Sequence, residues 1–230
     1  MKMRTTIRSA VLISAVLGVL VSGAAMAVDF SATVMISRGI KGKPIGPAQV
    51  LEKIYASGNK TREEQMGGQG QQVMINRPDK GVIWVIMPGS KSYMEMPSAY
   101  QANMFRGAEA KIKKMAGIKL VGTEKLNGYT CRKYMVTRLQ PSIDKQGKPG
   151  KSAPVTITFW YADKLDSLIK IGKEGTVQTA GGNQDRTQVI EFKDIKEGRQ
   201  AASLFELPKG YKKMQPKMPT SPQKPLGTHK

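Results

Sequence analysis

The sequence has very little of the two side chains on which most nucleophilic and zinc-dependent catalysis depends. Its one histidine, His229, stands one residue from the C-terminus, and its one cysteine is Cys131. Without a histidine in the body of the chain, no Ser–His or Cys–His nucleophile system can be assembled there. A zinc site needs several such ligands and is excluded on the same grounds. No pair of acidic residues stands out either, so we expect no enzyme, no cofactor and no metal site.

The single cysteine also limits how the chain is held together. Cys131 has no partner for an internal disulfide, so the fold must be stable through packing alone. An exposed lone thiol could pair with a second chain, whereas a free cysteine is more often a small buried apolar side chain. The sequence leaves both alternatives open.

Acidic residues are few in comparison with basic ones. The chain has 17 aspartates and glutamates against 37 lysines and arginines, which gives a formal net charge of +20. Such an excess favours anionic partners, such as phospholipid head groups, lipopolysaccharide or acidic polymers. A solvated basic surface without a dedicated partner explains the same charge. We expect no specific nucleic-acid partner.

Hydrophobic runs long enough to cross a membrane are absent after the first 27 residues. Three basic residues among the first eight precede the uncharged, mostly apolar run Ala10–Val21, and Ala25-Met26-Ala27 follows it. This is the order of a secretory signal peptide, with small residues at the cleavage site. An uncleaved membrane anchor is the alternative, but the run of 12 residues is short for a spanning helix, which needs roughly 20.

Cleavage of residues 1–27 would begin the mature protein at Val28. It removes three basic residues and no acidic residue, so the formal charge falls from +20 to +17. No cysteine stands at the cleavage point, where a bacterial lipoprotein would need one. We therefore expect a periplasmic protein that is not lipidated and is a monomer.

From residue 28 to residue 211 the chain reads as short strands separated by turns rich in glycine and proline. Val82–Met87 is an unbroken apolar run, typical of a strand buried on both faces. Asn127-Gly128 is the strongest hairpin signal. The predicted strands are Asp29–Arg38, Val50–Gln65, Gln71–Asn76, Val82–Met87, Ser92–Met96, Ile118–Leu126, Tyr129–Gln140, Val155–Tyr161, Ser167–Lys173, Gly175–Ala180 and Arg186–Lys193.

One segment has the periodicity of a helix. Between Ser98 and Met115, apolar side chains recur at steps of three and four residues, which predicts one helix with one apolar face. We therefore expect a mainly β (α+β) fold, in which a curved antiparallel sheet or half-barrel of about ten strands is closed by one main helix. This domain covers residues 28–211. Residues 212–230 have four prolines, several lysines and no acid, which predicts a disordered basic tail.

Several segments resemble a known group of exported proteins. They read IYASGNKTREE, QQVMINRPDKGVIWVIMPGSKSYMEM, GTEKLNGYTCRKYMV and SLFELPKGYKKM, and the resemblance covers most of residues 30–214. The group is an uncharacterised branch that is similar to the LolA/LolB lipoprotein carriers. The resemblance implies an incomplete antiparallel barrel around a helical lid, with an apolar cavity for acyl chains. The carriers have a helix before the first strand, which is missing here, so a sensor or adaptor on the same scaffold stays open.

Candidate binding residues follow from the expected helix and strands. Arg62 is a candidate for a polar contact with a lid or a head group, and an exposed charge at a strand edge explains it equally well. Ordinary core packing is the alternative for every apolar candidate. The candidates for the wall and lid of an apolar cavity are Trp84, Tyr93, Met104, Phe105, Ile112, Met115, Phe159 and Trp160.

The sequence therefore favours a non-enzymatic periplasmic protein that binds or carries lipid or lipoprotein acyl chains. The alternative is an electrostatic binder or adaptor for anionic envelope polymers or an anionic membrane surface, which would use the basic charge and the tail.

Overall fold

The computed structural model describes residues 28–67, 70–98, 105–140, 152–179 and 182–214. The predicted signal peptide, Met104, His229 and the end of the predicted tail lie outside the described residues. Among the described residues, no helix is long and apolar enough to cross a bilayer.

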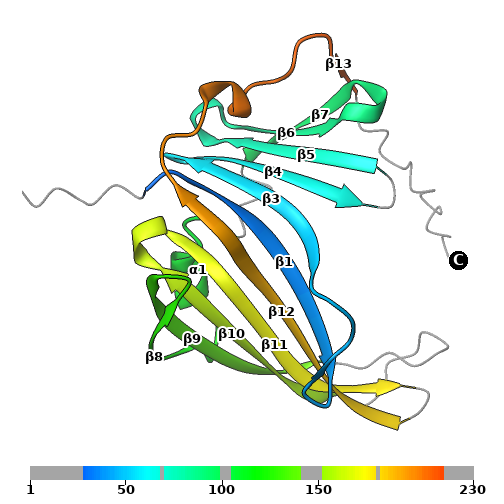
Figure 1. Ribbon diagram of the computed structural model, residues 1–230, viewed down its shortest axis with the longest axis vertical. Helices are drawn as coiled ribbons and strands as arrows, with labels where there is room; N and C mark the ends of the chain where they lie inside the picture. The colour runs from blue at the N-terminus through cyan, green and yellow to red at the C-terminus, as the bar shows by residue number, and fades with distance from the viewer. Residues whose placement is uncertain (1–27, 68–69, 99–104, 141–151, 180–181, 215–230) are drawn as a thin grey trace, which may run out of the picture.

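The described residues form one open, curved sheet (Figure 1). Its strands lie side by side in the order β13-β7-β6-β5-β4-β3-β1-β12-β11-β10-β9-β8, and β2 pairs with β1. All pairings are antiparallel except that of β13 with β7. The strands are β1 (Phe30–Ile40), β2 (Lys43–Pro44), β3 (Gln49–Ser57), β4 (Lys60–Gly67), β5 (Gly70–Arg77), β6 (Val82–Met87), β7 (Ser92–Pro97), β8 (Lys119–Leu126), β9 (Tyr129–Gln140), β10 (Ala153–Ala162), β11 (Ser167–Thr179), β12 (Gly182–Glu197) and β13 (Lys212–Lys213).

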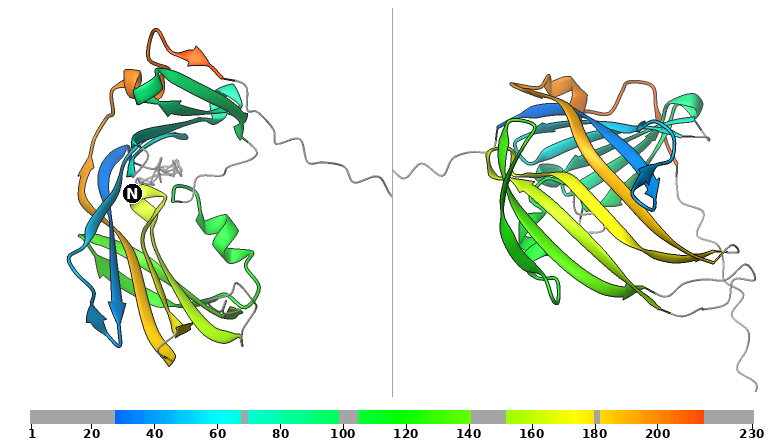
Figure 2. Two further views of the ribbon diagram at one scale, coloured as in Figure 1. Left: turned by 90° about the vertical axis from the view of Figure 1, so that its right-hand side faces the viewer. Right: turned by 60° about the horizontal axis from the view of Figure 1, so that its bottom comes forward.

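The sheet has a hollow side and an outer side. Figure 2 shows it in profile as a crescent, with α1 (Glu109–Lys113) on the hollow side and the C-terminal segment on the outside. We call these the inner and outer faces. The short 3-10 helices are η1 (Pro78–Lys80), η2 (Pro88–Ser90), η4 (Asp163–Leu165) and η5 (Ala202–Phe205).

The prediction of a mainly β, curved antiparallel sheet is confirmed, but the count of about ten strands is not exact, because the sheet has 13 strands and the prediction omits the two-residue strands β2 and β13. Two of the predicted bounds also differ. Val50–Gln65 is a hairpin and not one strand, because Gly58 adopts a φ of 56° and turns the chain between β3 and β4. Ser167–Lys173 and Gly175–Ala180 belong to one strand, β11. Gly175 stays in the ladder, and a Cβ there would lie 2.7 Å from a methyl of Val155, so the glycine permits close packing and does not break the strand.

The predicted helix over Ser98–Met115 is much shorter in the structure. Only Glu109–Lys113 is α-helical among the described residues of this range. Before it, the carbonyl of Phe105 accepts a bond from Leu168 N at 2.9 Å, and Gly107 N donates to Asp166 O at 2.7 Å. These bonds to the start of β11 hold the backbone out of helical geometry. Phe105 and Ile112 are nevertheless buried, so the predicted apolar face exists without the predicted helix.

The core is divided between the two faces of the sheet. The larger cluster joins the inner faces of β1, β3 and β9–β12 to Phe105, Ala108 and Ile112. Phe192 lies at its centre, with ring centroids 5.0 Å from Phe105 and 6.2 Å from Phe30. The smaller cluster lies on the outer face of β5 and β6 beneath η5, and its buried members are Val73, Ile75, Trp84, Ile86 and Phe205.

The C-terminal segment is part of the sheet. Lys212 and Lys213 pair with Ser92 and Tyr93 as strand β13, and Met214 N donates to Tyr93 O at 2.8 Å. The sheet thus includes two residues that the sequence assigned to the tail, and a third, Met214, bonds to its edge strand.

Candidate functional site

The inner face carries the larger of the two core clusters of the described residues, and the strand register defines it. Residues directly opposite each other on neighbouring strands point to the same face. Val34 at the centre of β1 is opposite Phe192 on β12 and Glu52 on β3. The inner face therefore runs from the core cluster beneath α1 to the hairpins β3–β7, but it is polar along β4, whose inner side chains include Thr61, Glu63 and Gln65.

The inner face of β5–β7 is rich in methionine. Met74, Val85 and Met94 form one cross-strand row, and Ile83 with Met96 forms the next. Ile83 and Val85 are buried, although neither belongs to the two core clusters of the described residues, and the three methionines are half-buried. Flexible, polarisable thioethers suit an apolar surface that adapts to its partner.

Two carboxylates interrupt this apolar surface where its two halves meet. Glu52 is opposite Gln65 and Glu63 is opposite Ile54, so both lie on the inner face, with 3% and 8% of their surface exposed. Gln65 Nε2 donates to Glu52 Oε2 at 3.1 Å. Burial, reinforced by the negative charge of Glu52, raises the pKa of Glu63 to about 7. Burial also raises the pKa of Glu52, against the hydrogen bond from Gln65.

The segment that carries α1 is held on the inner face by apolar and polar contacts. Ile112 is buried in the larger cluster, and the Glu109 carboxylate accepts a hydrogen bond from the Tyr134 hydroxyl. Glu109 also forms ion pairs with Arg132 at 2.6 Å and Lys113 at 3.2 Å. One short helix with few polar contacts therefore covers this part of the inner face.

The structure brings four of the eight apolar candidates together on the inner face. Phe105, Ile112 and Phe159 are buried in the larger cluster, and Met115 packs against it half-buried. Met104 lies outside the described residues.

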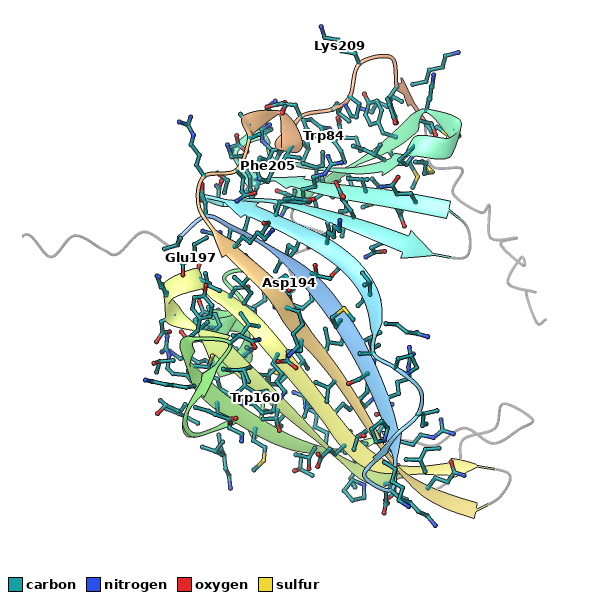
Figure 3. The ribbon with its side chains drawn as sticks, in the orientation of Figure 1. Trp84, Trp160, Asp194, Glu197, Phe205 and Lys209 are labelled. Atoms are coloured by element: carbon teal, nitrogen blue, oxygen red, sulfur yellow. The ribbon has the colours of Figure 1, made fainter. Side chains whose placement is uncertain are left out.

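The other three apolar candidates lie on the outer face by strand register, although the buried Trp160 also counts among the residues of the larger cluster. Trp84 packs in the smaller cluster with Phe205 (Figure 3), and its Nε1 donates to Glu95 Oε2 at 3.1 Å. Tyr93 packs against this cluster and is half-buried. Trp160 Nε1 donates to Glu124 Oε2 at 2.9 Å. The ammonium groups of Lys133 and Lys170 lie 5.1 Å and 4.9 Å from the centre of the Trp160 ring system.

Arg62 also lies on the outer face. Its guanidinium donates to the carbonyl of Leu204 at 3.0 Å and to Glu64 Oε1 at 2.7 Å. Arg77, which the sequence did not single out, makes the stronger attachment of the same C-terminal segment. It donates to Phe205 O at 2.8 Å and to Glu206 Oε1 at 2.5 Å.

A separate hollow of about 550 Å³ lies at the turn between β8 and β9. Its polar groups already bind one another, since Tyr129 Oη and Lys164 Nζ both donate to Glu197 Oε1, at 2.8 Å and 2.7 Å. Among the described residues, no group of three or more histidine, cysteine, aspartate or glutamate side chains could hold a metal ion.

Residues 48–147 match the model of a family described as a domain of unknown function, DUF4412. No curated protein matches the chain. Among solved structures, an uncharacterized conserved protein from Thermus thermophilus is 12% identical, with a TM-score of 0.43 over 83% of this chain and 92% of that one. The lipoprotein LppX from Mycobacterium tuberculosis is 12% identical, with a TM-score of 0.34 over 74% and 88%. LprF from Mycobacterium bovis is 14% identical, with a TM-score of 0.30 over 82% and 92%. Because these scores lie below 0.5, the likenesses assign no function to this chain.

Proposed function

We propose that this protein is a non-enzymatic periplasmic binding protein, which holds acyl chains of a lipid or lipoprotein against the inner face of its sheet. The observation that carries the proposal is that one face of the sheet bears two apolar surfaces. They are the cluster beneath α1, which includes Phe159, and the methionine-rich surface of β5–β7, with the polar inner side of β4 between them. We place the binding domain at residues 28–211, extended by β13, after an N-terminal export signal.

The physical basis is the transfer of hydrocarbon out of water. Burying an acyl chain gains about 0.8 kcal/mol per CH₂ group, so a chain needs a long apolar surface more than specific polar partners. A curved sheet supplies that surface. The segment Phe105–Ile118 is the element that would move, since displacing it would expose Phe159 and Phe192 to a ligand.

Lipid retention tests this function directly. The mature protein, purified without detergent, should carry lipid in native mass spectrometry. It should also bind a fluorescent fatty-acid analogue that oleate displaces. A lipid-free protein that binds no fatty-acid analogue would contradict the proposal.

A matched pair of methionine substitutions locates the binding. Met94→Gln places a polar amide on the inner face, where burial without a partner is costly, and should weaken binding of the fluorescent fatty acid by about tenfold. Met135→Gln makes the same change at an exposed position next to the inner-facing Val136, and should leave binding unchanged. Equal effects of the two substitutions would exclude the inner face as the binding surface.

The alternative function, binding to an anionic membrane surface or envelope polymer, is supported by the excess of basic residues. It predicts binding to anionic vesicles that is lost in high salt and needs no lipid within the protein. A measurement in high salt separates the two functions. A protein that holds acyl chains should keep its lipid there, whereas a protein that binds only through surface charge should lose its anionic partner.

A further inference from the structure

Basic side chains gather on the inner face at the end of the sheet far from η5. The register aligns Arg138 on β9 with Val155, Gly175, Arg186 and Ile40 on β10, β11, β12 and β1 in turn. Val155 is buried and lies on the same face as Phe159, two steps of two residues along β10. Arg138 and Arg186 therefore border the apolar inner face.

A second row of the inner face, two residues further along each strand, also contains basic side chains. Val136, Ile157, Lys173, Gln188 and Arg38 are aligned across the same five strands. These two rows together place four cations on one end of the inner face, and we call them the basic rim. The basic rim consists of Arg38, Arg138, Lys173 and Arg186.

The acidic residues next to the rim on the same strands, Glu174 and Asp185, lie on the opposite face. Glu174 alternates with Lys173 and Gly175 along β11, and Asp185 precedes Arg186 on β12, so both carboxylates point to the outer face. There Asp185 Oδ1 accepts a hydrogen bond from Thr176 Oγ1 at 2.8 Å. No rim residue takes part in a salt bridge between described residues.

The apolar floor beside the rim is well packed. Val136, Val155 and Ile36 are exposed over only 2%, 5% and 6% of their surface, whereas Arg38, Arg138 and Arg186 are exposed. Three exposed cations and the half-buried Lys173 thus stand at the end of an apolar surface. This arrangement matches an amphiphile, whose chain lies on the floor and whose anionic group meets the rim.

We propose that the basic rim binds the negatively charged phosphate head group of an amphiphile whose acyl chain lies along the inner face. This inference rests on the proposed function and adds the ligand class to it. The rim residues come from four strands and form no closed cradle of backbone amides, so the acyl chain supplies most of the affinity and the rim selects the head group.

The test compares two lysophospholipids with the same acyl chain, lysophosphatidylglycerol and lysophosphatidylcholine, by calorimetry on the mature protein. The wild type should bind the anionic lipid about tenfold more tightly. The double variant Arg138→Gln/Lys173→Gln should lose most of this preference while binding the zwitterionic lipid as before. The matched control, Lys133→Gln/Lys170→Gln, removes two cations from the outer face of the same strands and should keep the preference.

The outcomes separate the rim from the function on which it rests. If neither lipid binds the wild type, the proposed function fails. If both lipids bind the wild type equally, or if both double variants lose the preference alike, binding is supported and the rim is overturned. Inorganic phosphate forms a third arm, and its binding without lipid, abolished in the inner-face double variant, would show a simple anion site instead.

Discussion

Glu63 is a carboxyl group whose pKa lies far above the ordinary value for its type. It lies on the inner face beside Ile54, with Glu52 as a diagonal neighbour, and burial raises its pKa to about 7. In the unfolded chain the pKa returns to its ordinary value of 4.5. Between these two values the folded state holds a proton that the unfolded state has lost, so stability falls as the pH rises.

The substitution Glu63→Gln should remove this loss of stability at rising pH. The free energy of unfolding of the wild type should fall by about 3 kcal/mol between pH 4.5 and pH 7 through this group, and the variant should lack that decline. Urea denaturation across this pH range measures it. Glu64→Gln is the matched control, because Glu64 lies on the outer face of the same strand in an ion pair with Arg62, and it should keep the decline. A parallel pH dependence in wild type and Glu63→Gln would show that Glu63 is ionised throughout.

Cys131 resolves an alternative that the sequence left open. The side chain is completely buried in the larger cluster, and burial first, then Glu124 and Asp163, raises its pKa to about 11. The thiolate, which is the reactive form, is therefore scarce at neutral pH. A maleimide should label Cys131 at least a hundredfold more slowly in the native protein than in 6 M urea. Rapid native labelling, or a disulfide-linked dimer, would contradict this placement.

At the scale of elements, the C-terminal segment is the least expected stabilising feature. Phe205 of η5 packs against the outer face of β5 and β6 with only 1% of its surface exposed. Arg77 donates a hydrogen bond to its backbone carbonyl. Phe205→Ala should lower the free energy of unfolding by about 3–5 kcal/mol, because it removes a buried ring and leaves a cavity. Lys209→Ala, at an exposed position of the same segment (Figure 3), should change it by less than about 0.5 kcal/mol. Chemical denaturation distinguishes them, and a small effect of Phe205→Ala would mean that the segment is not docked.

The strands were predictable where local chemistry decides them. Val82–Met87 has the predicted bounds and is buried on both faces, and Asn127 with Gly128 forms the predicted hairpin with φ values of 51° and 84°. The predicted helix is too long because apolar periodicity shows which side chains are buried and not that the backbone is helical. The hydrogen bond from Gly107 N to Asp166 O, just before β11, competes with helical hydrogen bonds. No local pattern encodes that competition.

The inner face could not be deduced from strand alternation alone. Glu63 and Glu64 are neighbours of the same type, and only the pairing of β4 with β3 shows that Glu63 is the inner one. For the same reason Trp84 and Trp160 were reasonable candidates from their size, although both point outward. Faces are assigned by register between strands distant in sequence, which a one-dimensional pattern does not contain.

For the whole molecule, the curvature and the charge distribution act on different stages of ligand handling. The inner face offers hydrocarbon contact, which salt hardly weakens. The excess of 37 basic over 17 acidic residues acts at long range in water and is screened within about 10 Å at 0.1 M ionic strength. Approach to an anionic membrane and retention of an acyl chain should therefore respond differently to salt.

Raising sodium chloride from about 50 mM to about 500 mM should weaken association of the lipid-free mature protein with phosphatidylglycerol vesicles by at least about tenfold, since exposed charges are screened. The dissociation rate of a bound fluorescent fatty acid into buffer should change by less than about twofold, because its chain is held by apolar contact. Vesicle co-sedimentation and stopped-flow fluorescence measure the two quantities on the same preparation. If salt accelerates fatty-acid release as strongly as it reduces vesicle binding, surface charge holds the ligand. The inner face would then not be the binding surface.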